Sequence, residues 1–270
     1  MKTALLRSDH KVSLTHPDGS ALTFPSLSSR DVCTWFLQPE GVPPEANGML
    51  LSFLDGSERA RASSFRFVQH RDHYVASHAL LRAMLSAFTG IAPTTWRFAV
   101  NSYGRPEIDA NICTVPLRFN LSHTDGLVAC TVTLQRDVGV DVEAIDRADV
   151  DALLLRGVFT EEESAELRAK RPHDCISHFY CLWTLKEAFA KALGMGLSLP
   201  FDTIGFDLDP IRLRVGQHLY QHPAQWQFRL IQPTLRYWLA VAAREPSREE
   251  LRFTWTRVEF DFLAALLRSN

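Results

Sequence analysis

The sequence predicts an α+β fold built from two similar halves, because the same order of elements occurs twice along its 270 residues. In each half a long helix closed by a glycine leads into a strand rich in β-branched and aromatic residues. The first helix ends at Gly90 and the second at Gly194. Glycine often ends helices because it adopts the left-handed conformation without strain. We therefore expect a pseudo-twofold pair of α+β subdomains, with residues 1–136 in the first and residues 137–270 in the second.

The first half is expected to begin with a loosely structured lead-in, because residues 1–30 are rich in Ser, Thr, Pro and Asp and show no sustained period. Beyond it, β-branched and aromatic runs predict strands, Pro and Gly clusters predict loops, and an Asp-Gly pair between extended runs predicts a hairpin turn. These signals place a strand at Val32–Leu37, a loop at 39–48, a helix near Asp72–Phe88, a strand at Trp96–Val100 and a hairpin of Arg118–Ser122 with Leu127–Leu134.

The second half is expected to open with a strand at Val138–Glu143, where valines alternate with other residues. Segments of helical period and of strand-forming composition follow it. They are helices near Asp149–Leu155, Thr160–Arg168 and Ile176–Leu193, then strands near Thr203–Leu208, Gln225–Gln232 and Tyr237–Ala243.

Composition argues against several classes of protein. The chain has 29 Lys and Arg against 31 Asp and Glu, whereas a protein that coats nucleic acid or an anionic membrane carries a basic excess. No stretch approaches the roughly 18 apolar residues of a membrane helix, and the first residues lack the apolar core of a signal peptide. The five cysteines form no C-x-x-C pair, so no disulfide framework or structural zinc is expected. We expect a cytoplasmic protein without a nucleic-acid or membrane partner.

A candidate metal site lies on the strand Val138–Glu143. Side chains alternate along a strand, so the three valines face one way and Asp141 and Glu143 face the other. Two carboxylates one step apart repel each other unless they are exposed or bridged by a cation, and Mg²⁺ prefers such hard oxygen ligands. An edge strand with a solvated face explains the same pattern, and the strand alone leaves this alternative open.

The long helix near Ile176–Leu193 adds two lysines and a glutamate. Lys186 falls within the apolar arc of this helix, where an ammonium must reach past the apolar face or meet an anion. Glu187 lies at the margin of the arc, in line with Lys191. A plain Glu187–Lys191 pair one turn apart, worth about 0.2–0.5 kcal/mol, accounts for these two residues. It does not account for Lys186.

His123 lies next to Ser122 in the predicted hairpin turn, close to Asp125. Neighbours in one tight turn cannot form the convergent geometry of a hydrolase triad, and no G-x-S-x-G motif is present. Histidine at a turn is more often solvated or locally hydrogen-bonded. Its functional alternative is a donor to a phosphate oxygen.

Basic side chains cluster around the start of the first long helix, and one more lies in a Gly-Arg-Pro turn. They are Arg59, Arg61, Arg71, His73 and Arg105. The guanidinium fork suits phosphate oxygens, although a solvated basic face explains each residue taken alone. Neither a P-loop nor a dinucleotide-binding motif is present to supply a phosphate site.

Four motifs together resemble the Sfp-type 4'-phosphopantetheinyl transferases. They are Tyr103–Pro106, Phe119–His123, Gly139–Glu143 and Trp183–Lys191, followed by Gly196–Pro200. Residues 57–61 through 78–82 also look like the family's N-terminal helix region. Each motif is weak alone, but their order and spacing fit the family, and the likeness covers residues 32–243.

The resemblance implies two similar α+β halves with coenzyme A bound in the cleft between them. Family members move the phosphopantetheine arm of coenzyme A to a serine of an acyl or peptidyl carrier protein and release adenosine 3',5'-bisphosphate. The reaction uses Mg²⁺, with Mn²⁺ as an alternative ion. The resemblance also suggests a monomer.

The same resemblance implies roles for the acidic residues and the lysines. Asp141, Glu143 and Glu187 would hold Mg²⁺ on the pyrophosphate. Glu187, or a water that it orients, would draw the proton from the attacking serine. Lys186 and Lys191 would lie near the phosphates.

Further residues would bind coenzyme A. His123, next to Ser122, would donate to the pyrophosphate or a neighbouring phosphate, and Arg105 would replace the lysine of the usual Gly-Lys-Pro turn. The 3'-phosphate and adenine end would meet a basic set that matches the family less closely, namely Arg59, Arg61 and His73. The family often has Arg where His73 stands, so this contact would depend on pH.

Two other functions stay open. A metal-dependent nuclease also combines acidic strand residues with a nearby Glu and Lys, but its Glu-x-Lys lies on a strand, whereas Lys186-Glu187 has the reverse order on a helix. A non-catalytic protein of the same fold would bind coenzyme A or a carrier without modifying the carrier. The sequence does not decide whether fatty acid, polyketide or nonribosomal peptide synthesis is served.

Overall fold

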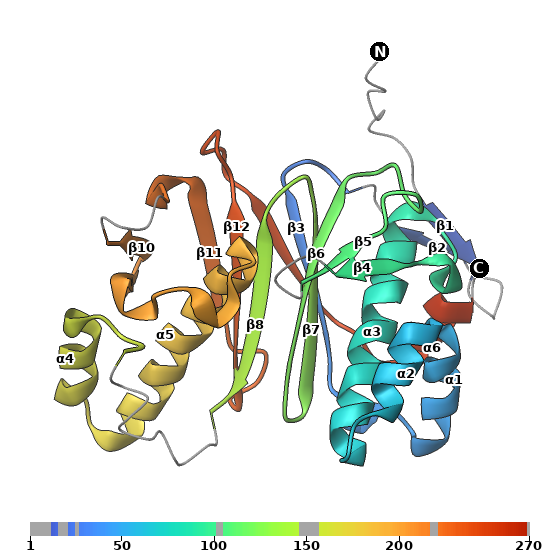
Figure 1. The fold of residues 1–270 in the computed structure, drawn as a ribbon, viewed down its shortest axis with the longest axis horizontal. Coiled ribbons are helices and arrows are strands. Elements are labelled where there is room, and N and C mark those ends of the chain that lie inside the picture. Colours follow the sequence, from blue (N-terminus) through green and yellow to red (C-terminus); the bar gives the residue numbers. More distant parts are fainter. Residues whose placement is uncertain are drawn as a thin grey trace.

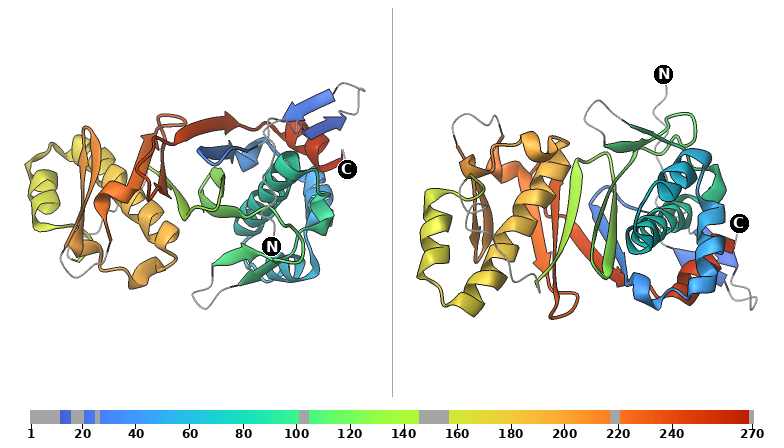
Figure 2. Two further views of the ribbon diagram at one scale, coloured as in Figure 1. Left: turned by 90° about the horizontal axis from the view of Figure 1, so that it is seen from above. Right: turned by 60° about the horizontal axis from the view of Figure 1, so that its bottom comes forward.

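The computed structural model describes residues 12–15, 21–24, 27–100, 105–145, 157–216 and 221–268. Two units of helices and strands lie side by side in it (Figures 1 and 2), which confirms the α+β class. The helix predicted at Asp149–Leu155 lies outside the described residues, and so do Tyr103 and Gly104 of the Gly-Arg-Pro turn.

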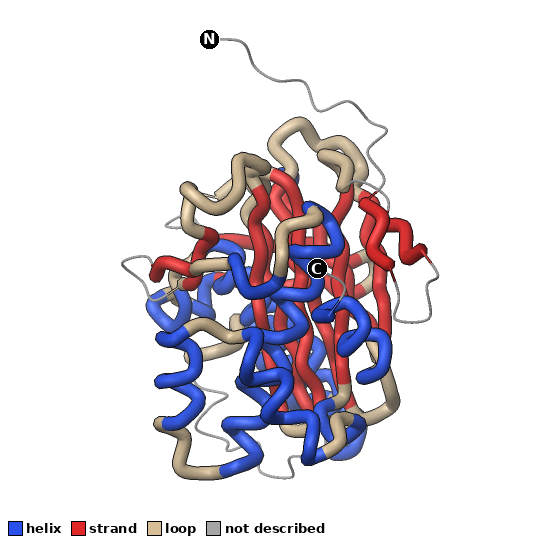
Figure 3. Tube along the Cα trace, turned by 90° about the vertical axis from the view of Figure 1, so that its right-hand side faces the viewer, coloured by secondary structure: helices blue, strands red, loops and turns tan. Residues whose placement is uncertain are grey.

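The first half is built on a four-stranded sheet of order β13-β3-β7-β6, and its helices lie in front of the strands when it is seen from its own side (Figure 3). The order includes β13 (Arg252–Arg257) from the end of the chain. The other elements are β3 (Asp31–Leu37), α1 (Asn47–Phe53), α2 (Gly56–Ser63), α3 (Val68–Thr89), β4 (Phe98–Val100), β5 (Pro106–Ile108), β6 (Leu117–Thr124) and β7 (Leu127–Leu134). The hairpin β6–β7 is confirmed, but β6 runs through His123 to Thr124, so His123 lies in a strand and not in the turn.

The lead-in contains regular structure that the sequence did not predict. β1 (Val12–Thr15) and β2 (Ala21–Phe24) pair as antiparallel strands. Each spans only four residues, which is too short for its alternation to stand out from a polar background.

The long helix α3 packs against the sheet of the first half. Its apolar face buries residues at helical spacing, among them Ala76, Leu80, Met84 and Ala87. The helix ends as predicted at Gly90, whose φ of 74° is left-handed. The counterpart in the second half, α5 (Pro172–Leu193), ends at Gly194 with φ of 71°.

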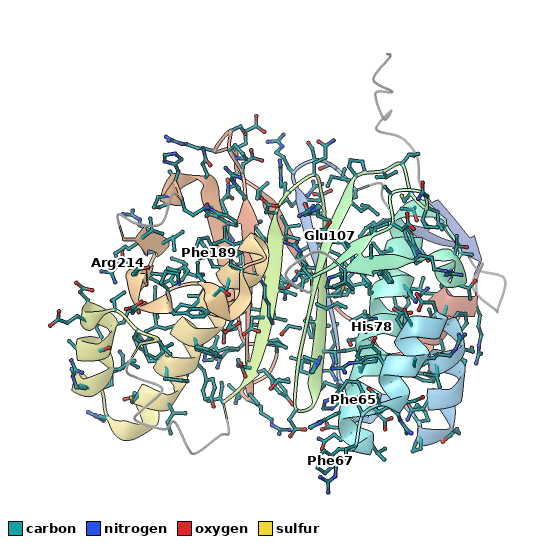
Figure 4. The ribbon with its side chains drawn as sticks, viewed as in Figure 1. Phe65, Phe67, His78, Glu107, Phe189 and Arg214 are labelled. Carbon is teal, nitrogen blue, oxygen red and sulfur yellow. The ribbon has the colours of Figure 1, made fainter. Side chains whose placement is uncertain are left out.

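The second half has a three-stranded sheet of order β11-β12-β8, against which α5 packs. Its elements besides α5 are β8 (Val138–Ala144), α4 (Glu161–Ala169), β9 (Ile204–Leu208), β10 (Ile211–Val215), β11 (Trp226–Ile231) and β12 (Tyr237–Arg244). Phe189 of α5 (Figure 4) meets Trp226 of β11 edge-on, with ring centroids 4.9 Å apart. Aromatic packing of this kind fixes α5 on the sheet.

The end of the chain returns to the first half. β13 pairs in parallel with β3, and α6 (Phe260–Arg268) packs against α3. Residues 252–268 were expected within the second half, 137–270, and the structure places them on the first. The division of the chain near residue 136 otherwise remains a prediction.

Each half contains a buried basic side chain, and the two are bound in the same way. Glu58 of α2 and Glu163 of α4 each close a capping box at the start of their helix. Glu58 also accepts hydrogen bonds from Arg82 of α3, and Glu163 forms an ion pair with Lys186 of α5 at 2.7 Å. Both cations are fully buried, and both also donate to backbone carbonyls beyond the end of their helix. This repeated arrangement supports the prediction that the two halves are similar.

The ion pairs of Glu58 give a prediction for acid stability. Burial alone would raise the pKa of Glu58, but the hydrogen bond and charge of His78 (Figure 4) and the charge of Arg82 outweigh burial and lower it. The resulting stability is complete above the ordinary pKa of 4.5 and is lost as pH falls through the lower folded-state pKa. Glu58→Gln should therefore flatten the dependence of the free energy of unfolding on pH in this acid range. Urea titrations across the range check this, and the exposed Glu45→Gln should behave like wild type.

Candidate active site

The packing of α5 on β8 brings the predicted acidic residues together with the helix. The valines of β8 face a core shared between the two sheets, as the alternation predicts. On the opposite face, Gly139 lies so close to α5 that an added Cβ would overlap the Ala188 carbonyl. This close approach is open only to glycine. It brings Glu187 and Lys191 of α5 next to the strand that carries Asp141.

Asp141 is the centre of the site and is only 4% exposed. Its Oδ1 accepts from Lys191 Nζ at 2.6 Å and from Ser122 Oγ at 3.0 Å. Ser122 Oγ in turn accepts from Lys191 Nζ at 2.9 Å and from the Val142 N–H at 3.3 Å. The cluster therefore joins β6 of the first half to β8 and α5 of the second.

Glu187 lies beside this cluster, and its pKa is raised. Burial and the negative charge of Asp141 raise the pKa of Glu187 to about 7, although the charge of Lys191 opposes the rise. Its carboxyl group is consequently poised to take up or release a proton near neutral pH.

Glu143 lies one step further along β8 and binds a different partner. Its Oε1 accepts from the indole N–H of Trp183 at 2.9 Å. Trp183 packs against Phe201, with ring centroids 5.6 Å apart. Trp183, a residue without a role in the sequence analysis, thus orients the second carboxylate of the strand.

The carboxylates of this site are the candidate ligands of a divalent cation. Within the part of the chain that the structure describes, no group of three His, Cys, Asp or Glu side chains is close enough to hold a metal ion. Convergence of Asp141, Glu143 and Glu187 is therefore not confirmed. However, Asp141 Oδ2 is buried and has no hydrogen-bond partner among the described residues. The negative charge of Asp141 also acts on the neighbouring carboxylate of Glu187. These two carboxylates fit a hard cation such as Mg²⁺, which commonly takes one or two.

Two histidines face each other near the cluster. The rings of His73 on α3 and His123 on β6 have centroids 6.4 Å apart. Burial, with the charges of His73 and Lys191, lowers the pKa of His123 to about 4, and burial also lowers the pKa of His73. Both imidazoles are therefore neutral at physiological pH, and each can donate through one ring nitrogen.

The low pKa of His123 is open to direct measurement. In the ligand-free protein its ring resonances should titrate with a midpoint near pH 4, because burial penalises the imidazolium. Adenosine 3',5'-bisphosphate should move the midpoint upward if it binds beside this ring, since negative charge favours the imidazolium. Heteronuclear NMR of ring-labelled protein, with His123→Gln for assignment, gives both values. A midpoint near 6.5 would mean that water reaches the ring, which is exposed on β6, well enough to cancel this shift.

Lys186 does not join the site, contrary to the sequence prediction. Its ammonium is fully buried against Glu163 and donates to the carbonyls of Val158 and Phe201 at 3.0 and 2.9 Å. A third carbonyl, of Ile204, also accepts from it. Lys186 therefore has no free donor for a phosphate.

The arginines predicted to bind coenzyme A have protein partners of their own. Arg105 donates to backbone carbonyls around the end of α5. Arg59 donates to the Leu54 carbonyl, and the Arg61 guanidinium lies over the ring of Phe65, 5.1 Å from its centroid. Arg59 and Arg61 keep an exposed position on α2, so their role toward a ligand remains a prediction.

The chain is similar to several 4'-phosphopantetheinyl transferases. The family model of the 4'-phosphopantetheinyl transferase superfamily matches residues 137–242. The 4'-phosphopantetheinyl transferase HetI of Nostoc sp. is 32% identical over 174 residues, which cover 64% of this chain and 73% of HetI. The chain belongs to the 4'-phosphopantetheinyl transferase family.

A second relative agrees with the assignment of the chain as a phosphopantetheinyl transferase. The 4'-phosphopantetheinyl transferase gsp of Aneurinibacillus migulanus is 31% identical, covering 62% of this chain and 68% of its own. A holo-(acyl-carrier-protein) synthase from Bacillus anthracis, solved in complex with CoA (3',5'-ADP), is 17% identical, covers 40% of this chain and 95% of its own, and has a TM-score of 0.34.

Asn120 also links the strands of the site, a contact that the sequence did not predict. Asn120 on β6 accepts the Val140 N–H through Oδ1 at 2.9 Å, two residues before Ser122 accepts the Val142 N–H. Side chains thus connect the two halves where β6 meets β8. Their alternation along β6 was the signal available in the sequence.

Among the helices that the structure describes, none is long and apolar enough to cross a membrane.

Proposed function

We propose that this transferase moves the 4'-phosphopantetheine group of coenzyme A to a serine hydroxyl of an acyl or peptidyl carrier protein. The observation that carries the proposal is the cluster at the boundary between the halves, where Lys191 Nζ binds Asp141 Oδ1 at 2.6 Å and Ser122 Oγ at 2.9 Å with Glu187 beside them. Transfer from a pyrophosphate to a hydroxyl requires a base effective near neutrality and a cation near the departing phosphate. Glu187 and Lys191 supply these two groups.

The residues of this chain divide the work of the transfer. The serine oxygen bonds to the phosphorus that carries the pantetheine arm, and the bond from this phosphorus to the bridging oxygen of the pyrophosphate breaks. The serine proton passes to Glu187. Adenosine 3',5'-bisphosphate leaves with the electron pair of the broken bond, and Lys191 stabilises the negative charge that develops on it. Phosphoryl transfer depends mainly on such positioning and charge stabilisation.

Asp141 and Glu187 are the residues that would hold Mg²⁺ or Mn²⁺, with Glu143 as the third predicted ligand. When bound, the ion supplies neutralisation of the pyrophosphate charge. The chain itself places one ammonium, that of Lys191, against the carboxylates of Asp141 and Glu187. The two carboxylates outnumber this ammonium, so the site repels a phosphate unless a divalent cation is bound.

The remaining predicted contacts concern binding. Neutral His123 is proposed to donate to the pyrophosphate, and Ser122 to fix Lys191 beside it. Burial and the charges of His73 and Lys191, which lower the pKa of His123, keep this donor uncharged in the free protein. The 3'-phosphate and adenine end would meet Arg59, Arg61 and His73. A monomeric state and a cytoplasmic location remain predictions from the sequence.

Intact-mass spectrometry tests the proposed activity and the choice of carrier. Apo carriers of fatty acid, polyketide and nonribosomal peptide synthesis are each incubated with the protein, coenzyme A and Mg²⁺. At least one should gain the mass of a single phosphopantetheine, and its Ser→Ala variant should gain none. Binding of coenzyme A without a mass gain on any carrier would contradict transfer and favour a non-catalytic protein.

A further inference from the structure

Arg105 holds the end of α5 to both strands of the site. Its Nη1 donates to the carbonyls of Ala192 at 3.1 Å and Lys191 at 3.4 Å. Its Nη2 donates to the carbonyls of Val138 on β8 at 3.2 Å and Phe119 on β6 at 3.5 Å. One guanidinium thereby reaches three elements, and its flat fork of donors suits such a junction.

The end of α5 is a place where a cation stabilises the fold. The last carbonyls of a helix lack partners within it and carry the negative end of the helix dipole. The left-handed Gly194 returns its own N–H to the carbonyls of Ala190 and Lys191. The Ala192 carbonyl binds Arg105, whose side chain lies 3.8 Å from where a Cβ of Gly194 would be.

The same three elements meet again at the catalytic cluster. Lys191 Nζ, on α5, binds Asp141 on β8 and Ser122 on β6. Arg105 connects the backbone of residue 191 to these two strands, while the Lys191 side chain connects to them through its ammonium. We infer that Arg105 is a positioning residue that acts through the last turn of α5 to hold Lys191 against Asp141. This differs from the phosphate contact that the sequence predicted for it.

Arg105→Met tests this inference, with Arg118→Met as the matched control. Arg118 is a neighbouring arginine on β6 that pairs with the Asp137 carboxylate at 3.3 Å. In ligand-free Arg105→Met, the backbone amides of Gly194 and Met195 should exchange their hydrogens roughly tenfold faster than in wild type, because the last turn of α5 is no longer held. The kcat of transfer should fall roughly 10- to 100-fold, with a KM for coenzyme A within about threefold of wild type. Arg105→Lys should recover part of both losses, and Arg118→Met should show neither.

Each other result would overturn the positioning role. Unchanged exchange with a raised KM would mean that Arg105 contacts the phosphates directly. Faster exchange with unchanged kcat would leave Arg105 a purely structural residue. The kinetic part rests on the proposed function, whereas exchange is measured without substrate. An inactive wild type would therefore count against the proposed function, and exchange would still decide whether Arg105 holds the last turn.

Discussion

Asp141→Asn is expected to lower the rate of carrier modification by roughly 10²–10³-fold, the usual effect of removing one electrostatic group from a transfer site. The change keeps the shape of the side chain but removes the charge that holds Lys191 Nζ at 2.6 Å. It also removes one of the two carboxylates that fit a cation. Single-turnover kinetics followed by intact-mass spectrometry of the carrier measure the loss.

The fold should survive this substitution. Loss of the ion pair with Lys191 is offset by relief of the repulsion of Glu187, so the free energy of unfolding should change by no more than about 1 kcal/mol. Asp137→Asn is the matched control, because Asp137 is 40% exposed and pairs with arginines outside the cluster. Full activity of a folded Asp141→Asn protein would refute the role of Asp141.

The parts of the fold that follow from local signals could be predicted from the sequence. The alternation of β8 places its valines in a core and Asp141 opposite them, and the glycines at 90 and 194 end the two long helices. Period and capping are properties of neighbouring residues, so one chain reveals them. The parallel pairing of β13 with β3 joins residues 252–257 to 31–36. Nothing local in either segment specifies a partner so distant along the chain.

The site was predictable to the extent that its residues lie on one face of one element. The resemblance assigned Asp141 and Lys191 to one site, and the structure places Lys191 Nζ 2.6 Å from Asp141 Oδ1; their roles there remain predictions. Lys186 shows where this reasoning fails. Its place in the apolar arc implied that the ammonium reaches past the apolar face or meets an anion, but the sequence could not distinguish a phosphate from Glu163 of the preceding helix. The choice depends on how α4 packs on α5, which is tertiary information.

Lys186→Met is expected to destabilise the protein by about 3–5 kcal/mol, because it leaves Glu163 charged, unpaired and fully buried. In a chain of this size that loss lowers the melting temperature by roughly 10 °C. The double variant Glu163→Gln with Lys186→Met should recover part of the stability. Glutamine removes the buried charge and keeps an acceptor for the Phe206 N–H, which Glu163 binds at 2.9 Å. Thermal and urea unfolding of the two variants measure the difference.

Lys191→Met, on the same helix, is expected to lower transfer more than it lowers stability. Lys191 is 27% exposed and its partner Asp141 also binds Ser122, so losing it should cost less stability than losing Lys186. Transfer should nevertheless fall steeply, whereas Lys186→Met assayed well below its melting temperature should keep most of its activity. If Lys186→Met melted like wild type and lost transfer, Lys186 would belong to the phosphate site after all. The two lysines therefore separate the residue that stabilises the second half from the residue that serves the chemistry.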